Sequence, residues 1–336
     1  MKKLFAILLA AVSLSAAAGV QPVQPTPRPA YNTGCGFYVV GGKVYDPTGV
    51  EFRIRGVNRV HWNDLSPGIP NSGANTERIS IDFRQTSATN LGVIQREIQA
   101  FGIVPMVASW NATGFTDAAS LSAIVDLWVA QASTWTTLNC NGMVNIANEW
   151  GADNSTSWRD GYLAAIPRMR AAGYTGLLVI DAGVSGQSAK DIANYGQALM
   201  DADPQHNLLF DVHMYGAFHR PATASWMQDY DTAVASMGAT GLPIIVGEFG
   251  PGRNIGPSPT LITPDQIVIT AESNGWGWMP WAWDDFNGPS NSCTDDWFGM
   301  ARSWGAFDGV TYSQLTLFGQ DMVTLMKSMA VKAHFN

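Results

Sequence analysis

The chain has 336 residues, of which 46% are hydrophobic and 14% charged, so it can bury a sizeable core as one large domain or two small ones. Its formal net charge of −8 argues against nucleic acid and anionic membranes as partners, because both attract basic proteins. The spacing of its three cysteines and five histidines fits no zinc site, and there is no HExxH pattern, so we predict no metal and no cofactor.

The composition of the first 34 residues predicts two segments that lie outside the folded domain. Lys2 and Lys3 precede the apolar run LFAILLAAVSL and a small-residue stretch ending at Ala18, which is typical of a secretory signal peptide over residues 1–18. Residues 19–34 are rich in proline and lack periodicity, so they predict an extended tether. We expect a secreted or periplasmic monomer whose folded domain covers residues 35–336.

An oxidising compartment would allow one disulfide among the three cysteines and would leave one thiol over. The sequence does not fix the pairing among Cys35, Cys140 and Cys293. We favour Cys35 with Cys140, because both precede predicted strands at the same end of the expected fold.

The folded domain begins with two alternating runs around Gly41 and Gly42, which predict a short β-hairpin. Apolar runs then predict eight strands, at residues 52–57, 75–81, 102–109, 142–148, 175–181, 207–213, 242–248 and 275–283. Eight strands separated mainly by helices point to a (β/α)8 TIM barrel. An open nucleotide-binding sheet would need a GxGxxG turn after its first strand, and the sequence has none.

Helical periodicity fills most of the connections. Residues 121–133 predict a helix whose apolar stripe contains Leu121, Ile124, Val125, Trp128 and Val129. Residues 262–273 predict a helix with Thr263 as N-cap and Pro264 at its first position, and residues 315–331 predict the last helix. The first connection, 59–75, is only weakly helical, so its helix should be reduced or replaced. Residues 284–309 predict a long loop that rims the site.

Polar and aromatic residues follow the predicted strands where a barrel carries its chemistry. Thirteen tryptophans are many for a chain with so few charges, and several stand beside polar residues, as in HWND, SWNATG, NEWG and PWAWDD. Aromatic faces in an open cleft suit sugar rings. The strand-end candidates, in chain order, are His61, Trp62, Arg78, Trp110, Asn111, Asn148, Glu149, His213, Tyr215, Glu248, Trp281 and Trp283.

Two carboxylates in this set, Glu149 and Glu248, should face each other across the barrel mouth. Cleavage of a glycosidic bond needs one acid to protonate the leaving oxygen and one carboxylate to meet the anomeric carbon. Arg78 and Tyr215 can orient Glu248 as nucleophile, and His213 can influence the proton on Glu149. Asn148 can bind a sugar 2-hydroxyl and Trp281 can form a floor under the ring, which leaves the other strand-end residues as candidates for substrate contact.

The chain resembles glycoside hydrolase family 5, and within it the bacterial β-mannanases. The segments GVNRVHW, GANTERI, NIANEW, DPQHNLLFDVHMYG, PIIVGEFG and GWGWMPWAW carry this resemblance, which runs from about residue 37 to 290. It implies a TIM barrel and retaining hydrolysis, with Glu149 as acid/base and Glu248 as nucleophile. It gives the supporting roles of the family to Arg78, Asn148, His213, Tyr215 and Trp281.

The expected substrate is a β-1,4-linked hexose polysaccharide, with mannan or glucomannan first. Three departures from the mannanase pattern, at Trp110, Ser185 and the WDDFN segment, lie around the sugar-binding subsites. They keep an endo-β-1,4-glucanase open as the alternative. A carbohydrate-binding barrel without turnover is the alternative from another class, and a serine hydrolase is disfavoured because GVSGQ lacks the GxSxG pattern.

Two quantitative expectations follow for the glutamate pair. A retaining mechanism predicts that the carboxyl groups lie roughly 5 Å apart. An ionised Glu248 should raise the pKa of Glu149 well above that of a free glutamate.

Overall fold

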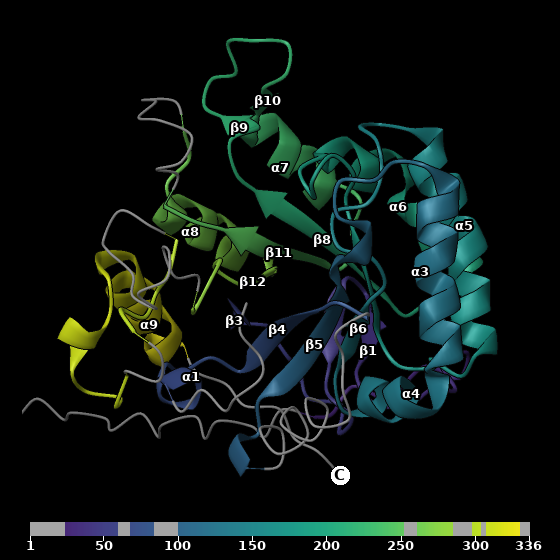
Figure 1. Cartoon of the computed structure of the whole chain (residues 1–336), viewed down its shortest axis with the longest axis horizontal. Coiled ribbons are helices and arrows are strands. Elements are labelled where there is room, and N and C mark those ends of the chain that lie inside the picture. Colours follow the sequence, from purple (N-terminus) through teal and green to yellow (C-terminus); the bar gives the residue numbers. More distant parts are fainter. Residues whose placement is uncertain are drawn as a thin grey trace, which may run out of the picture.

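The protein is described by a computed structural model that covers residues 24–59, 68–83, 100–251, 261–284, 298–303 and 307–329. Eight parallel strands form its central sheet, in the order β12-β11-β8-β7-β6-β5-β4-β3 (Figure 1). These strands are β3 (Gly56–Arg59), β4 (Thr76–Ile81), β5 (Val104–Ser109), β6 (Met143–Asn145), β7 (Leu178–Asp181), β8 (Leu208–Met214), β11 (Ile244–Phe249) and β12 (Gly277–Trp278).

The two edge strands of this sheet meet, so the sheet closes into a barrel. Trp278 N donates to Ile54 O, just before β3, over 3.0 Å, and Arg55 forms a parallel bridge with Trp278. Closure leaves no unpaired edge of the kind that an open sheet exposes. The predicted (β/α)8 TIM barrel is confirmed.

The eighth strand is much shorter than the predicted run 275–283. Pro280 has no N–H to continue the ladder. Beyond it, Trp281 N donates to Phe249 O (2.8 Å) and Trp283 N donates to Asn58 O (2.7 Å), so this segment bonds alternately to strands on either side.

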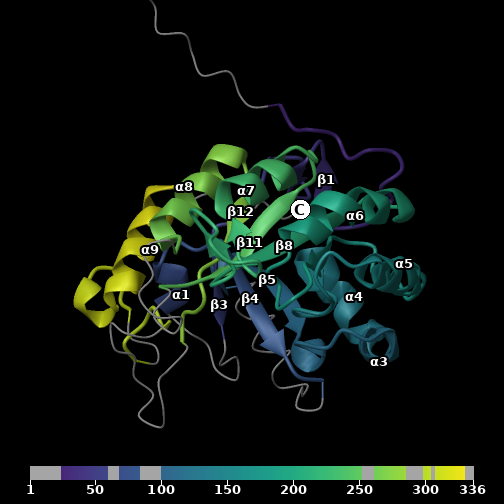
Figure 2. The same cartoon turned by 90° about the horizontal axis from the view of Figure 1, so that it is seen from above.

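Helices surround the barrel (Figures 1 and 2). They are α1 (Gly68–Asn71), α3 (Ala118–Ala130), α4 (Ala132–Asn141), α5 (Thr156–Ala171), α6 (Ala189–Ala202), α7 (Tyr230–Gly238), α8 (Pro264–Asn274) and α9 (Leu317–Ser328), with 3-10 turns η1 (Trp110–Ala112) and η3 (Tyr312–Gln314). Of the first connection, expected to be only weakly helical, the described part holds the short helix α1, and residues 60–67 lie outside the described residues. The predicted cap of α8 is also confirmed, since Thr263 and Gln266 form a capping box.

The helix predicted over 121–133 is wrong in two respects. It is divided between α3 and α4 at Gln131, whose backbone (φ −110°, ψ 19°) is not helical. Val129 is 40% exposed, whereas the other four members of the predicted stripe are buried. The stripe is therefore narrower than the sequence suggested.

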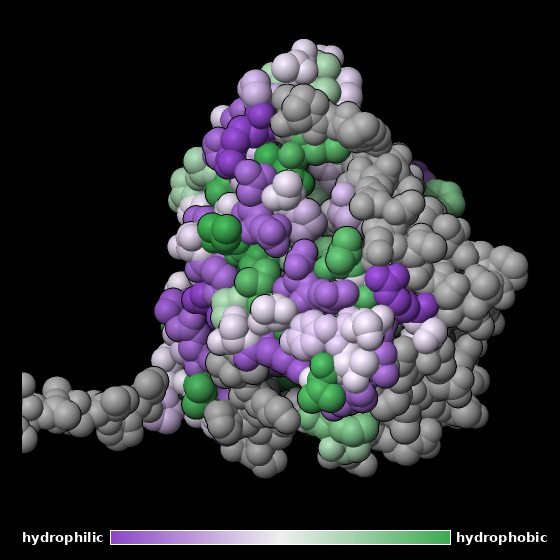
Figure 3. Space-filling view, turned by 90° about the vertical axis from the view of Figure 1, so that its left-hand side faces the viewer, coloured by the Kyte–Doolittle hydropathy of each residue, from purple (hydrophilic) through white to green (hydrophobic). Residues whose placement is uncertain are grey.

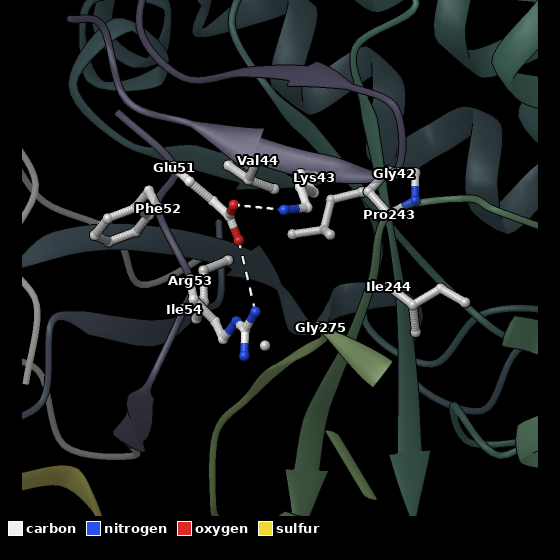
Figure 4. Close-up of a pocket in the computed structure, with 12 residues that line it drawn as sticks. Gly42, Lys43, Val44, Glu51, Phe52, Arg53, Ile54, Pro243, Ile244 and Gly275 are labelled. Carbon is white, nitrogen blue, oxygen red and sulfur yellow. Dashed lines mark hydrogen bonds and ion pairs between the residues drawn. The ribbon is translucent and has the colours of Figure 1, made fainter. Parts of the chain in front are cut away.

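The N-terminal end of the barrel is plugged by the predicted hairpin, formed by β1 (Tyr38–Val40) and β2 (Lys43–Tyr45). Its apolar side chains join those of the barrel interior in one buried cluster. Figure 4 shows a pocket of about 20 Å³ at this end, beside the ion pair of Lys43 with Glu51 (2.6 Å). That space holds about one water molecule. We therefore expect a polymer to bind at the opposite end of the barrel.

The favoured disulfide between Cys35 and Cys140 is present and ties the start of the hairpin segment to the end of α4. Cys293 lies outside the described residues. Residues 24–34, the described part of the predicted tether, lie against the domain: Thr26 N donates to Gly49 O (2.8 Å), and Gly34 N donates to the side chain of Gln205 (3.1 Å). The predicted leader, residues 1–18, also lies outside the described residues.

After β8 the chain forms a small parallel pair, β9 (Phe218–His219) and β10 (Gln228–Asp229), whose connecting loop projects at the top of Figure 1. On the face shown in Figure 3, apolar residues form separate patches between polar ones. Within the described ranges, none of the helices is both long and apolar enough to cross a membrane.

Candidate active site

Glu149 lies at the carboxyl end of β6, four residues beyond the last residue of that strand. Its backbone is held by both neighbouring strands: Asn148 N donates to Ser109 O (2.8 Å), and Glu149 N donates to the carboxylate of Asp181 (3.0 Å). Glu149 has a φ of 52°, a left-handed conformation that is strained for a residue with a Cβ. These contacts hold the carboxylate in an orientation that the chain would not adopt unaided.

Glu248 lies in β11, where the pairing with β8 shifts register between Val246 and Glu248. Such a bulge redirects a side chain at the rim of a barrel. Carboxylate oxygens of Glu248 and Glu149 lie within 4.8 Å of each other. That spacing suits two carboxylates acting on one carbon by double displacement, for which the carboxyl groups lie roughly 5 Å apart.

Both oxygens of Glu248 have a donor, as predicted. Arg78 Nη1 donates to Oε1 (2.6 Å), and the hydroxyl of Tyr215 donates to Oε2 (3.0 Å). The other guanidinium nitrogen, Arg78 Nη2, donates to Asn148 Oδ1 (2.6 Å). Arg78 is fully buried, so one cation links the ends of the two strands that carry the glutamates.

His213 lies beside Glu149, as predicted. Its Nδ1 is 2.8 Å from Glu149 Oε1 and 3.6 Å from the nearer oxygen of Glu248. The imidazole is fully buried, so water does not screen its interaction with either carboxylate.

The pKa of Glu149 is opposite to the predicted direction. Burial acts to raise it, but the hydrogen bond and charge of His213, together with Arg78, lower the pKa below the usual range. The pKa of His213 is raised: burial opposes this, while Glu248, Asp211 and Glu149 favour the cation. Without a ligand, the shared proton therefore resides on the imidazole, one hydrogen bond away from the carboxylate that must donate it.

The pKa of Glu248 is raised to about 7. Burial is the largest cause, and the charges of Glu149 and Asp181 add to it, while His213 and Arg78 oppose it. Burial thus disfavours the ionised form of Glu248, and the two cations favour it. Removal of either cation should therefore raise the pKa of Glu248 further.

The predicted aromatic residues divide into two groups. Trp110 and Trp281 are partly exposed and stack on each other, with ring centroids 5.5 Å apart. Trp283 is only 1% exposed and packs near Phe307, so its ring lies in the core. His61 and Trp62 lie outside the described residues.

Asn111 is not brought to the carboxylates. Its amide donates to Asp82 Oδ1 (2.8 Å) and its carbonyl oxygen accepts from Phe83 N (3.0 Å). Both ends of the side chain are therefore engaged at the end of β4.

Four more polar residues belong to this site: Asn58, a candidate at the end of the first predicted strand, and Thr113, Asp181 and Asp211, which the sequence reasoning missed. Asn58 links Arg78 (3.2 Å) to Gly247 O (2.7 Å), and Thr113 accepts from Asn148 (2.9 Å). Asp181 and Asp211 are fully buried in β7 and β8. An aspartate inside an otherwise apolar strand, as in LLVID and LLFDVH, was the available signal, because such a charge is costly to bury without partners.

In the part of the chain that the structure describes, two triads bring possible metal-ligand atoms within 4.8 Å: Glu149 with His213 and Glu248, and Asp181 with Asp211 and His213. Arg78 contacts a carboxylate of each triad, Glu248 at 2.6 Å and Asp181 at 3.3 Å. A guanidinium at this distance repels a second cation. We therefore interpret both triads as charge networks, and the expectation of a metal-free site stays a prediction.

Comparisons with known proteins agree on one family. The model of the family described as Cellulase (glycosyl hydrolase family 5) matches residues 108–287. A mannan endo-1,4-beta-mannosidase from Salipaludibacillus agaradhaerens is 31% identical over 297 residues, 85% of this chain and 92% of that protein. Another from Streptomyces lividans is 31% identical over 75% of this chain and 67% of its own length. The mannohexaose complex of Thermomonospora fusca beta-mannanase superposes with a TM-score of 0.72 at 26% identity, covering 89% of this chain and 99% of that one.

Proposed function

The chain belongs to glycosyl hydrolase family 5, and on that premise we propose that this retaining glycoside hydrolase is an endo-β-1,4-mannanase of mannan and glucomannan. The observation that carries the proposal is the pair Glu149 and Glu248, which present carboxylate oxygens within 4.8 Å at the open end of the barrel. The choice of mannan is supported by relatives that are named mannan endo-1,4-beta-mannosidase.

In the proposed reaction, Glu248 attacks the anomeric carbon while Glu149 gives a proton to the glycosidic oxygen. The C–O bond breaks and a glycosyl ester of Glu248 forms. Glu149 then takes a proton from the water that displaces Glu248, which restores both groups. Arg78 and Tyr215 hold the two oxygens of Glu248 in place for the attack.

Two further residues have proposed roles at the reacting sugar. Asn148 Oδ1 is held by Arg78 and its amide nitrogen contacts Thr113. A second N–H of that amide is then available for the sugar 2-hydroxyl. Trp281, which is partly exposed, is proposed as the floor beneath the ring.

Hydrolysis of a panel of polysaccharides tests the substrate. We expect the protein to release oligosaccharides of mixed length from mannan and glucomannan, and to do so faster than from carboxymethylcellulose. Chromatography of the products at early times measures both rate and length. Release of monosaccharide alone would contradict endo action, and absence of hydrolysis on every polymer would contradict the proposal as a whole.

The alternative substrate, β-1,4-glucan, is favoured by one feature of the cleft. Trp110 stands where the mannanase pattern has histidine, and it stacks on Trp281. Faster cleavage of carboxymethylcellulose than of mannan would support this alternative with the same two glutamates. A binding barrel without turnover is disfavoured by family membership and by the complete glutamate pair.

We also propose that the protein is exported and acts outside the cytoplasm as a monomer. The disulfide between Cys35 and Cys140 supports this, because such bonds persist in oxidising compartments. Expression in a host that exports proteins should yield extracellular or periplasmic protein. Its measured mass should be that of a chain cleaved after Ala18. Recovery of the full-length chain in the cytoplasm, with both thiols reduced, would contradict export.

A further inference from the structure

Two buried aspartates lie beneath the glutamate pair, and each holds the backbone of one glutamate segment. Asp181, at the end of β7, accepts from Glu149 N (3.0 Å) and from Arg78 Nη2 (3.3 Å). Asp211, in β8, accepts from Gly247 N (2.7 Å), the residue before Glu248. Both aspartates are fully buried, so these contacts are not exchanged for water.

The same two aspartates flank the far side of His213. Its Nε2 lies 3.7 Å from Asp181 Oδ2 and 3.8 Å from Asp211 Oδ2. Among the described residues, neither His213 Nε2 nor Asp211 Oδ2 has a hydrogen-bond partner. A buried polar atom without a partner is costly, unless a charge of opposite sign lies close to it. Two carboxylates facing one ring nitrogen provide that charge when the nitrogen carries a proton.

The position of Asp211 also leaves little freedom at the bulge that presents Glu248. A Cβ on Gly247 would lie 2.0 Å from Asp211 Oδ2 and 2.2 Å from Oδ1. Only glycine therefore fits above this carboxylate, and its N–H is aimed at Asp211. The aspartate and the glycine together fix the register shift between Val246 and Glu248.

We propose that Asp181 and Asp211 are paired positioning residues: each fixes the backbone beside one glutamate, and together they hold a proton on Nε2 of His213. The imidazole is then a cation whose other nitrogen, Nδ1, can pass its proton to Glu149 over 2.8 Å. This inference rests on the proposed roles of Glu149 and Glu248. In addition to those roles, the two aspartates would set the pH range in which Glu149 and Glu248 are active.

The sign of the effect follows from the charges that face His213. They come from Glu149 after β6, Glu248 on β11, Asp181 on β7 and Asp211 on β8, and the cation of Arg78 on β4 offsets part of them. Removal of one negative charge favours loss of a proton from every member of this cluster. The acid limb of kcat/KM, set by Glu248, and the alkaline limb, set by the shared proton, should therefore both move to lower pH.

Asp211→Asn tests this directly, because it keeps an oxygen for Gly247 N–H and removes the charge. We expect both limbs to fall by about one pH unit, and kcat to fall roughly 10- to 100-fold with KM nearly unchanged. Asp181→Asn should shift the limbs in the same direction. If both variants fold and their pH profiles superpose on that of the parent, the proposal is overturned.

Asp191→Asn is the matched control. Asp191 is equally buried and accepts from two backbone N–H groups, Gly183 (3.0 Å) and Ser155 (3.2 Å), but its hydrogen bonds lie among the loops at α6. The Asp191→Asn variant should be less stable than the parent, but both limbs of its pH profile of kcat/KM should stay in place. A shift as large as that in Asp211→Asn would show that any buried aspartate has this effect, and would overturn the specific role.

A measurement on the unmodified protein decides the case even if the variants do not fold. The ¹⁵N shifts of the histidine side chains, with His213 assigned in the unmodified protein from the neighbouring protons that its ring contacts, should show both ring nitrogens of His213 protonated at pH 6. A bare ring nitrogen at that pH would refute the proposal. Since this readout does not depend on turnover, it separates failure of the positioning role from failure of the proposed hydrolase function.

Discussion

Replacement of Glu248 by alanine is expected to lower kcat on the preferred polysaccharide roughly 10⁴- to 10⁶-fold, because it removes the nucleophile from a site whose other groups are arranged around it. The fold should persist: Arg78 loses one partner but keeps Asn148 (2.6 Å) and Asp181 (3.3 Å). Steady-state rates, with circular dichroism as the test of folding, measure this. If the variant kept activity within about tenfold of the parent, the loss would be no larger than that from a minor contact, and Glu248 could not be the nucleophile.

Rescue with azide distinguishes the roles of the two glutamates. In Glu248→Ala, azide can enter the vacated side, so a C–N bond forms as the glycosidic bond breaks, and Glu149 protonates the leaving oxygen. The glycosyl azide should have inverted configuration. In Glu149→Ala, an aryl glycoside with a good leaving group can still form the ester of Glu248, and azide then displaces it, which gives retained configuration. If the two products were exchanged between the variants, the assigned roles would have to be exchanged as well.

The barrel and its two carboxylates could be predicted because their signals are local. Strands buried on both faces are continuous apolar runs, and each run ends where polar residues begin, as at Asn148 and Glu149. Parallel strands bring such ends to one edge of a barrel, so their proximity follows from topology. The shortening of β12 was harder to foresee, because the aromatic run GWGWMPWAW continues through Pro280, whereas the regular strand ends at Trp278.

The electrostatics of the site could not be predicted in the same way. The direction of the pKa of Glu149 depends on contacts that only the fold brings together: the contact with His213 at 2.8 Å and the charge of Arg78 outweigh the effect of burial. Likewise, Asp181 and Asp211 belong to different strands, and only their register brings both to one nitrogen of His213. The position of Trp283 in the core shows the same limit. Trp281 and Trp283 lie two residues apart in the same sequence motif, but Trp283 is buried in the core.

Arg78→Ala should have the largest effect on stability. Arg78 is fully buried and contacts Glu248 (2.6 Å), Asp181 (3.3 Å) and Asn148 (2.6 Å). Its removal leaves two buried carboxylates without their shared cation, which costs about 3–5 kcal/mol of unfolding free energy. Denaturant titration of parent and variant at neutral pH measures the difference. A loss below about 1 kcal/mol, typical of an exposed ion pair, would contradict this account of the buried network.

The pH dependence of that loss follows from the carboxylates that remain. The pKa of Glu248 is already raised to about 7, and without Arg78 it should rise further, together with that of Asp181. A group whose pKa is higher in the folded than in the unfolded state costs stability as the pH rises between the two values. The destabilisation by Arg78→Ala should therefore be smaller at pH 5 than at pH 7.5.

Arg170→Ala is the control, because Arg170 also forms a buried ion pair, with Asp203 (2.6 Å). This pair lies before the starts of β7 and β8, where Arg170 also donates to Tyr174 O, Gly176 O and Asn207 O. It should cost comparable stability with kcat unchanged, whereas Arg78→Ala should also lose turnover, since Glu248 would then be protonated and no longer aimed.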